Sequence, residues 1–456
     1  MNVIFILLDD LGWNDVGINN SQIYTPNINN FAYDGCRLLR NYTFPVCGPT
    51  RAMIQTGVYA YKCGMQRLFS PWEDYGLDIN LKTLPQYLKE IDYKTYAIGK
   101  WHLGHNDKKF LPNNRGYDYY YGNVTGCVHH YDHHHGNGGS LPEAQIHDFL
   151  ENGKPVYDKG HFCDLFTNKC LEVIENNKNN KFFIYLAYNS PHVPLECPEN
   201  FKNFYNISNP KKSYYGMIMH LDFNIGKIFD KLKSLELYDN TLIWIQSDNG
   251  GWLLDWAGGD NYPLKNGKTS FNEGGVRVFS AIKSNKINIK ESSVFIHSTD
   301  VLPTILDLCG YNKPISVDGR SELNNIVSNT YEEKEIVLGF YNESYWCFLF
   351  DNIKVISEGD FGIKCFDILK DPLEDNNLIE YYNDNKNKIE DKIKECLKYR
   401  VQEPKDKYSK NLAKHKCQKI KFWGQQNKKI FLNNEIIDEN PKKSFLELSG
   451  YDVFYR

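Results

Sequence analysis

Short apolar runs alternate with stretches of helical periodicity through most of the chain up to Ile282, and this alternation limits the possible folds more than any other feature. The apolar runs are Val3–Leu8, Tyr96–Gly99, Phe182–Ala187, Leu242–Gln246 and Val276–Ile282. The stretches with helical spacing include Leu84–Ile91, Cys170–Asn176 and Tyr215–Leu235. Continuous apolar strands separated by helices indicate a mostly parallel sheet that is covered on both faces. We therefore predict an α/β fold with a large, mostly parallel mixed sheet sandwiched by helices.

The pattern changes near residue 330. Short hairpin strands are predicted beyond it, at Glu335–Phe340, Trp346–Phe350, Ile353–Ser357 and Cys365–Ile368. A charged helix is expected over Asp384–Tyr399, followed by a polar and basic segment over Gln402–Gln426. We predict a large domain over residues 1–330 and a smaller α+β domain over 331–456, with an antiparallel sheet and a tail that wraps the surface.

Charge and hydropathy exclude some classes of partner. The chain has 456 residues, and its 53 Lys and Arg nearly balance its 57 Asp and Glu, so we expect no nucleic-acid partner. No apolar run reaches the roughly 18 residues of a membrane span, so no transmembrane segment is expected. The run Val3–Leu8 lacks the basic flank and cleavage site of a signal peptide, and it is interpreted as a buried strand.

Cysteines and glycosylation motifs favour a secretory route. The chain has 12 cysteines, more than a reducing compartment usually needs. Asn-x-Ser/Thr sequons occur at Asn19, Asn41, Asn123, Asn206 and Asn342.

Acidic side chains follow two of the predicted strands. Asp9 and Asp10 come directly after the first apolar run, and Asp248 and Asn249 come just after the fourth. The carboxyl ends of parallel strands meet at one edge of a sheet, where ligands usually bind. Three acids so close would repel each other without a cation, and oxygen ligands suit Ca²⁺ or Mg²⁺. Each segment alone is also compatible with a simple loop.

A cysteine and an arginine mark the start of a predicted helix. Cys47 lies ahead of the helix-like segment that begins at Ala52, and Arg51 follows it four residues later. A helix N-terminus and a nearby guanidinium make a positive environment for a cysteine. A structural cysteine beside a turn proline is an equally good interpretation.

Basic groups follow the second and third runs. Lys100 and His102 are two residues apart, so in an extended chain both face the same side and could contact one anion. His192 lies in a proline-rich turn, and Lys268 lies in a loop before Glu273. A lone histidine is more often structural, but a Lys-x-His pair between glycines after a strand favours a site. His192 is equally compatible with a turn histidine that faces solvent, and Lys268 alone is typical of a solvated loop lysine.

Five histidines crowd together as if to bind zinc: His129, His130, His133, His134 and His135. Their spacing does not match a closed zinc site. We expect them to lie in a surface loop.

Taken together and in this order, these segments resemble the type I sulfatase family over nearly the whole chain. The matching blocks are Leu8–Asp15, Cys47–Arg51, which fits the Cys-x-Pro-x-Arg signature, Gly99–Gly104, Ser247–Gly251 and Glu273–Arg277. Within the family, the likeness points to the arylsulfatase B branch, the N-acetylgalactosamine-4-sulfatases. That likeness is carried by Asn261–Leu264, by Phe366–Ile368 with Asp371–Pro372, and by Cys417–Trp423.

The resemblance implies an alkaline phosphatase-like fold and two added groups. One is a single Ca²⁺, with Mg²⁺ as the alternative. Its implied ligands are Asp9, Asp10, the modified residue Cys47, Asp248 and Asn249. The other is formylglycine, an aldehyde that a formylglycine-generating enzyme makes from Cys47 during biosynthesis.

The resemblance also implies the catalytic roles. A hydroxyl of the aldehyde hydrate attacks sulfur, and Arg51 offsets the charge of that hydrate. Lys100, Lys268 and His192 bind the sulfate oxygens, and His192 also protonates the departing alcohol. His102 takes the proton from the second hydroxyl, which releases sulfate.

The implied activity is removal of sulfate from a sulfated sugar, with N-acetylgalactosamine 4-sulfate units of glycosaminoglycans as the expected substrate and a lysosomal or secreted location. Two alternatives remain open. One is a phosphate or phosphonate ester hydrolase of the same fold, and the other is a non-catalytic relative that binds sulfated glycans.

Overall fold

The computed structural model describes residues 1–67, 75–135, 146–330, 332–341 and 343–399, together with two short strands, β18 (Phe431–Leu432) and β19 (Glu435–Ile436). A search of the helices in this described part found none with the length and apolar character that a membrane crossing requires.

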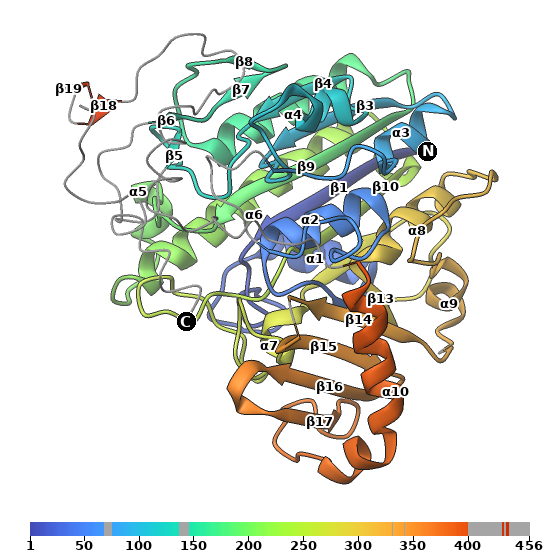
Figure 1. Cartoon of the computed structure of the whole chain (residues 1–456). Coiled ribbons are helices and arrows are strands. Elements are labelled where there is room, and N and C mark those ends of the chain that lie inside the picture. The colour runs from blue at the N-terminus through green and yellow to red at the C-terminus, as the bar shows by residue number, and fades with distance from the viewer. Residues whose placement is uncertain are drawn as a thin grey trace.

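A large mixed sheet lies at the centre of the molecule (Figure 1). Its middle strands are mutually parallel and lie in the order β10 (Thr241–Ser247), β1 (Asn2–Asp9), β9 (Phe182–Pro191), β3 (Lys94–Gly99) and β4 (Tyr119–Gly122). Beyond β10 the sheet continues through β12 (Ser280–Lys283), β2 (Cys36–Tyr42), β11 (Arg277–Val278) and β13 (Glu291–His297). Beyond β4 it continues through β7 (Leu150–Glu151) and β8 (Lys154–Pro155), while β5 (His134–His135) and β6 (Ile146–His147) form a separate pair. The predicted mostly parallel sheet is confirmed.

Helices cover both faces of this sheet because alternate side chains of each strand point to opposite faces. In β1, one set of buried side chains (Ile4, Ile6, Leu8) packs in one core with α1 (Pro26–Asp34), α4 (Phe162–Asn176) and α6 (Lys211–Ser234). The alternate set (Val3, Phe5, Leu7) packs in a second core with α2 (Cys47–Thr56), α3 (Leu84–Lys89), α8 (Val301–Leu308) and α9 (Leu323–Ser328). Each such side chain stabilises the fold by about 1.5–3 kcal/mol. A continuous apolar run therefore correctly predicts a strand that is buried on both faces.

One predicted strand is wrong as a single element. Val276 ends the short helix α7 (Glu273–Val276), and β11 and β12 follow it as separate strands. Both pair with β2, but Arg277 lies opposite Tyr42 whereas Ala281 lies opposite Arg37, so the register shifts by one residue between them. A shift of this kind interrupts the ladder without interrupting the apolar pattern.

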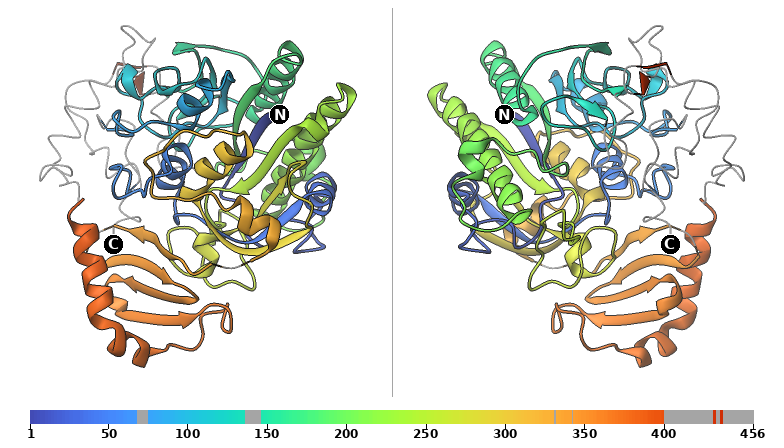
Figure 2. Two further views of the ribbon diagram at one scale, coloured as in Figure 1. Left: turned by 90° about the vertical axis from the view of Figure 1, so that its right-hand side faces the viewer. Right: turned by 90° about the vertical axis from the view of Figure 1, so that its left-hand side faces the viewer.

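A second, smaller sheet and a helix lie together at one end of the molecule (Figures 1 and 2). Its antiparallel strands are β14 (Glu335–Phe340), β15 (Tyr345–Phe350), β16 (Ile353–Glu358) and β17 (Ile363–Asp367). Helix α10 (Ile379–Leu397) packs on this sheet through Ile389 and Cys396. The predicted strands and helix are confirmed. The division at residue 330 stays a proposal, and the predicted tail over Gln402–Gln426 lies outside the described residues.

The small sheet is joined to the rest by buried charges. Lys354 of β16 lies 2.9 Å from Glu273 and 3.0 Å from Glu374, and all three side chains are fully buried. Glu358, at the end of β16, accepts hydrogen bonds from the Ser270 hydroxyl at 2.7 Å and from the Phe271 amide at 2.9 Å. The strand β16 is therefore bonded to the loop that leads into α7.

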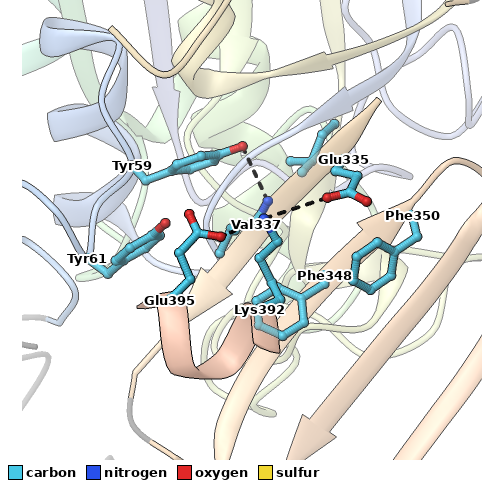
Figure 3. A pocket seen from close by; sticks show the side chains of 9 residues that line it. Tyr59, Tyr61, Glu335, Val337, Phe348, Phe350, Lys392 and Glu395 are labelled. Atoms are coloured by element: carbon cyan, nitrogen blue, oxygen red, sulfur yellow. Dashed lines mark hydrogen bonds and ion pairs between the residues drawn. The ribbon is translucent and has the colours of Figure 1, made fainter. Parts of the chain in front are cut away.

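A small pocket lies at another contact between the two parts (Figure 3). Tyr59 and Tyr61 form one side of it, and side chains of β14, β15 and α10 form the other. The Val337 amide donates to the Tyr59 hydroxyl at 3.4 Å across this contact. The pocket contains none of the predicted site residues.

Candidate active site

Neighbouring parallel strands deliver the predicted site residues to one edge of the large sheet. β1 ends at Asp9, and Asp10 follows it with a left-handed φ of 64°. Asp248 follows β10, His192 follows β9, and Lys100 follows β3. Because these strands are adjacent and point the same way, their carboxyl ends lie side by side.

Helix α2 brings the cysteine and the arginine to the same edge. Cys47 is the first residue of this helix, and its Sγ lies 3.4 Å from Asp9 Oδ1 and 3.8 Å from Asp10 Oδ1. Arg51 lies one turn later on the same face of the helix. Its Nη2 donates to Asp248 Oδ2 at 2.7 Å and its Nη1 donates to the Lys100 carbonyl at 3.0 Å. The arginine thereby joins α2 to two strand ends.

Three further basic groups contact the same carboxylates. Lys100 Nζ lies 2.6 Å from Asp9 Oδ2. Lys268 Nζ lies 2.7 Å from Asp10 Oδ2 and 3.6 Å from the sulfur of Cys47. His192 Nε2 lies 3.5 Å from Asp10 Oδ2. The structure thus gathers the predicted basic groups around the cysteine.

The donor set of this cluster fits a hard divalent cation. Asp9, Asp10, Cys47 and His192 each offer a ligand atom, and these atoms lie within 4.8 Å of one another. Asn249 donates through Nδ2 to Asp10 Oδ1 at 2.8 Å, while its own Oδ1 is buried and has no hydrogen-bond partner among the described residues. Buried polar atoms are rarely left unpaired without an ion or water. Carboxylate and amide oxygens suit Ca²⁺ or Mg²⁺.

Burial shifts the pKa values of the site. It raises the pKa of the Cys47 thiol well above its usual range, and the carboxylate of Asp248 adds to that shift, so the group is a thiol rather than a thiolate. Burial, followed by the repulsion of Asp9, raises the pKa of Asp248 to about 6. Burial lowers the pKa of His192 to about 3 and, with Lys100, lowers that of His102 well below its usual value. Both imidazoles are therefore neutral, and a bound anion would raise their pKa values.

His102 lies two residues after Lys100, in a backbone conformation with φ 55°. A Cβ placed on Gly126 would lie 2.6 Å from its imidazole ring. A Cβ on Gly48, next to the cysteine, would lie 4.0 Å from the same ring. Glycine at position 126 therefore makes the room that the imidazole needs beside Cys47.

The expectation of a histidine-rich surface loop is wrong for His130, His133 and His135, which are buried. His130 donates through Nε2 to the backbone carbonyl of His192 at 3.1 Å. The thiol of Cys127 donates to the Val193 carbonyl at 3.4 Å. Histidine spacing alone does not reveal burial, because burial depends on the turn after β9 that packs on these residues. His130 and Cys127 hold the backbone around His192 in place.

Sequence reasoning missed Tyr214 and Asp15. The hydroxyl of Tyr214 lies 3.0 Å from the Asp10 carbonyl and 2.8 Å from Asp15 Oδ2. Asp15 also accepts from the Gly12 amide at 3.1 Å. Tyr214 lies on the buried face of α6, where periodicity identifies it only as a core residue. The pair fixes the backbone that places Asp10.

The evidence for a secretory route is weaker in the structure than in the sequence. Asn41 and Asn123 are fully buried, so these two sequons cannot carry a glycan in the folded protein. Asn342 lies outside the described residues. Within the described part of the chain, the buried Cys36, Cys163 and Cys170 are free thiols. The lysosomal or secreted location stays a prediction.

Comparison with known proteins decides the family. The profile of the Sulfatase family matches residues 1–311. The chain belongs to the sulfatase family. This sulfatase is 33% identical over 331 residues to arylsulfatase J of Mus musculus, an alignment that covers 70% of the chain but only 54% of that relative. It is 26% identical over 366 residues to N-acetylgalactosamine-6-sulfatase of Homo sapiens, covering 74% of the chain and 67% of the relative.

A solved structure agrees with the fold. The sulfatase superimposes on Ps i-CgsB in complex with k-i-k-neocarrahexaose with a TM-score of 0.78 and 30% sequence identity, covering 89% of this chain and 94% of that one. The fold expected from the resemblance, a large mixed sheet between helices with a small antiparallel sheet beside it, is confirmed. The likeness to the arylsulfatase B branch stays a prediction.

Proposed function

We propose that this sulfatase hydrolyses sulfate esters of sugars, with residue 47 as the nucleophile after its conversion to formylglycine. One observation carries the proposal: Cys47 Sγ lies within 3.4 Å of a carboxylate oxygen of Asp9 and 3.6 Å of the ammonium of Lys268. A nucleophile at this position would have oxygen ligands for a cation on one side and a cation for an anionic substrate on the other.

Two added groups would complete this arrangement. Asp9, Asp10, Asp248 and Asn249, with residue 47, would hold one Ca²⁺ or Mg²⁺, which supplies Lewis acidity to an oxygen bound to it. The hydrate of formylglycine would carry two hydroxyl groups. One would supply the nucleophile, and the other would permit release of the product.

The remaining side chains orient the substrate and move protons. Lys100 and Lys268 bind the sulfate oxygens, where negative charge grows in the transition state. His192 lies beside the same oxygens, and the adjacent anion raises its pKa so that it can protonate the leaving alcohol. His102, neutral in its buried position, accepts the proton released at residue 47. Arg51 offsets the charge of residue 47 and keeps Asp248 in place.

A sulfated sugar is the substrate class that the relatives support. The similar proteins include sulfatases named for aryl sulfate and for N-acetylgalactosamine 6-sulfate, and Ps i-CgsB was solved with a neocarrahexaose. As the specific substrate we propose N-acetylgalactosamine 4-sulfate units of glycosaminoglycans, as in the arylsulfatase B branch, with conversion by a formylglycine-generating enzyme and a lysosomal or secreted location.

Two measurements test the activity. A mass spectrum of the peptide that contains residue 47 should show the mass of formylglycine, which is lower than that of cysteine. The purified protein should hydrolyse 4-nitrophenyl sulfate much faster than 4-nitrophenyl phosphate. The reverse preference would favour the phosphate or phosphonate ester hydrolase, and binding of chondroitin sulfate without hydrolysis of either ester would favour the non-catalytic relative. Disaccharides sulfated at position 4 or position 6 then test the sugar specificity.

A further inference from the structure

An apolar loop lies next to the nucleophile position. It runs from Trp252 to Trp256, directly after the segment that contains Asp248 and Asn249. Lys268 Nζ lies 5.0 Å from the centroid of the Trp252 ring and 3.6 Å from the sulfur of Cys47. Lys268 is therefore a common neighbour of Trp252 and residue 47.

The loop presents unusually large apolar side chains to solvent. Trp256 is 48% exposed, Leu253 is 48% exposed and Leu254 is 37% exposed. The two tryptophan rings pack edge to face, with centroids 4.8 Å apart and planes inclined by 67°. A cluster of exposed aromatic and apolar side chains beside a polar site is typical of a binding surface rather than of ordinary protein exterior.

The backbone at the base of this loop is held in place. Asn261 accepts from the Gly251 amide and donates to the Gly251 carbonyl, both at 2.9 Å. The Gly259 amide donates to the Trp252 carbonyl at 3.1 Å, and Gly258, with φ 83°, lies against Tyr214 of α6. Because the loop is bonded at both ends, binding a ligand to its side chains costs little ordering entropy.

We propose that Trp252 and Trp256 form a sugar-binding subsite, which stacks against the C–H face of the ring adjoining the sulfated residue of a glycan chain. This inference rests on the proposed function, because it assumes that sulfate binds at Lys268 and residue 47. The flat apolar face of an indole matches the C–H face of a sugar ring, while its N–H can bond a hydroxyl. Because Trp252 lies beside Lys268 and packs against Trp256, the ring adjoining a sugar whose sulfate is held by Lys268 would meet the two tryptophans.

The test compares an oligosaccharide substrate with a small aryl sulfate. Wild type and Trp256→Ala are assayed with 4-methylumbelliferyl sulfate and with a tetrasaccharide of chondroitin 4-sulfate or ι-carrageenan, whichever the wild type hydrolyses. We expect KM for the tetrasaccharide to rise about tenfold, as for loss of one stacked ring, while kcat/KM for the aryl sulfate changes less than twofold. Trp256→Phe should recover most of the affinity. Phe361→Ala, at a residue 76% exposed on the small sheet, is the matched control and should change neither value.

Each other outcome has a distinct meaning. If the wild type hydrolysed neither substrate, the proposed function itself would be overturned. An active wild type whose kinetics with both substrates are unchanged by Trp256→Ala would overturn the subsite alone. An equal loss with both substrates would also overturn it, since the loop would then support the reaction centre rather than a neighbouring sugar. If Trp256→Ala instead changed only the oligomeric state in gel filtration, the apolar loop would be a contact between copies of the chain.

Discussion

Replacing Lys354 by methionine should lower the free energy of unfolding by about 3–5 kcal/mol, although this residue lies in the small sheet and contacts no part of the active site. The ammonium lies 2.9 Å from Glu273 and 3.0 Å from Glu374, and all three side chains are fully buried. Methionine fills a similar volume but leaves the carboxylate of Glu374 in the interior without its counter-charge, and leaves Glu273 with only the more distant Arg277, at 3.6 Å. Breaking a buried ion pair from one side is costly for that reason.

The charges in the wild type are consistent with strong pairing. Burial lowers the pKa of Lys354, but the carboxylates of Glu273 and Glu374 outweigh that effect, and the net shift is upward. Burial raises the pKa of Glu374. Without Lys354, which lowers the pKa of Glu374, this carboxyl should bind its proton at still higher pH. The loss of stability should therefore be largest at neutral and alkaline pH and should shrink as the pH falls toward 5.

Urea unfolding followed by tryptophan fluorescence measures this effect, at pH 5 and at pH 8. The matched control is Lys388→Met in α10, because Lys388 lies 2.7 Å from Glu335 but both side chains are about half exposed. Exposed pairs of this kind contribute about 0–1 kcal/mol. If Lys354→Met destabilised the protein no more than the control, or equally at both pH values, the assignment of a buried charge network would be refuted.

Three further predictions follow from the site and the core. Cys47→Ser should abolish hydrolysis of 4-nitrophenyl sulfate without changing the melting temperature, and near wild-type rates would contradict the proposed chemistry. Asp248→Ala should remove the bound divalent cation, so elemental analysis that still found one ion per chain would oppose the ligand assignment. Burial raises the pKa of Asp222 from its ordinary 3.8 to about 6. The folded state therefore binds this proton more tightly than the unfolded state, and the contribution of Asp222 to stability is largest below pH 4 and is lost as the pH rises through 6. Asp222→Asn should reduce the change of melting temperature with pH between pH 4 and pH 6. The same change with pH as in the wild type would contradict this role of Asp222.

The elements that positioned the site were the most predictable from the sequence. The strands β1, β9 and β10 each contain a continuous apolar run because both faces are covered, and each run leads directly into polar residues at the sheet edge. Strand β2 (Cys36–Tyr42) escaped prediction because Arg37, Arg40 and Asn41 interrupt its apolar pattern, although Asn41 is fully buried. Local patterns record the burial of a whole strand, but not the burial of single polar side chains that tertiary contacts enclose.

The cluster around Cys47 was predictable as a set of residue types, since all its members except the loop residue Lys268 follow a predicted strand or lie near the start of a predicted helix. The residues outside the cluster, with which it makes or adjoins tertiary contacts, were not predictable. His130 belongs to a tract that looks like a polar loop, and Trp252 follows the Asp-Asn-Gly-Gly segment with no periodic pattern to indicate exposure. Lys354 lies in a strand whose alternation gives no sign that its ammonium meets Glu273 from another part of the chain. Contacts between distant segments decide these roles, and a single sequence does not encode their pairing in any local feature.

The hydrogen bonds from Ser270 and Phe271 to Glu358 have an implication for engineering. The loop that contains Lys268 is hydrogen-bonded to Glu358 at the end of β16, so its position depends on the small sheet. A shortened version of the protein that keeps every proposed catalytic side chain but ends before β16 would lose the support of one of the two lysines that we propose to bind sulfate. Grafting the small sheet of a relative would alter turnover as well as stability, unless the recipient strand supplied a carboxylate at the same point.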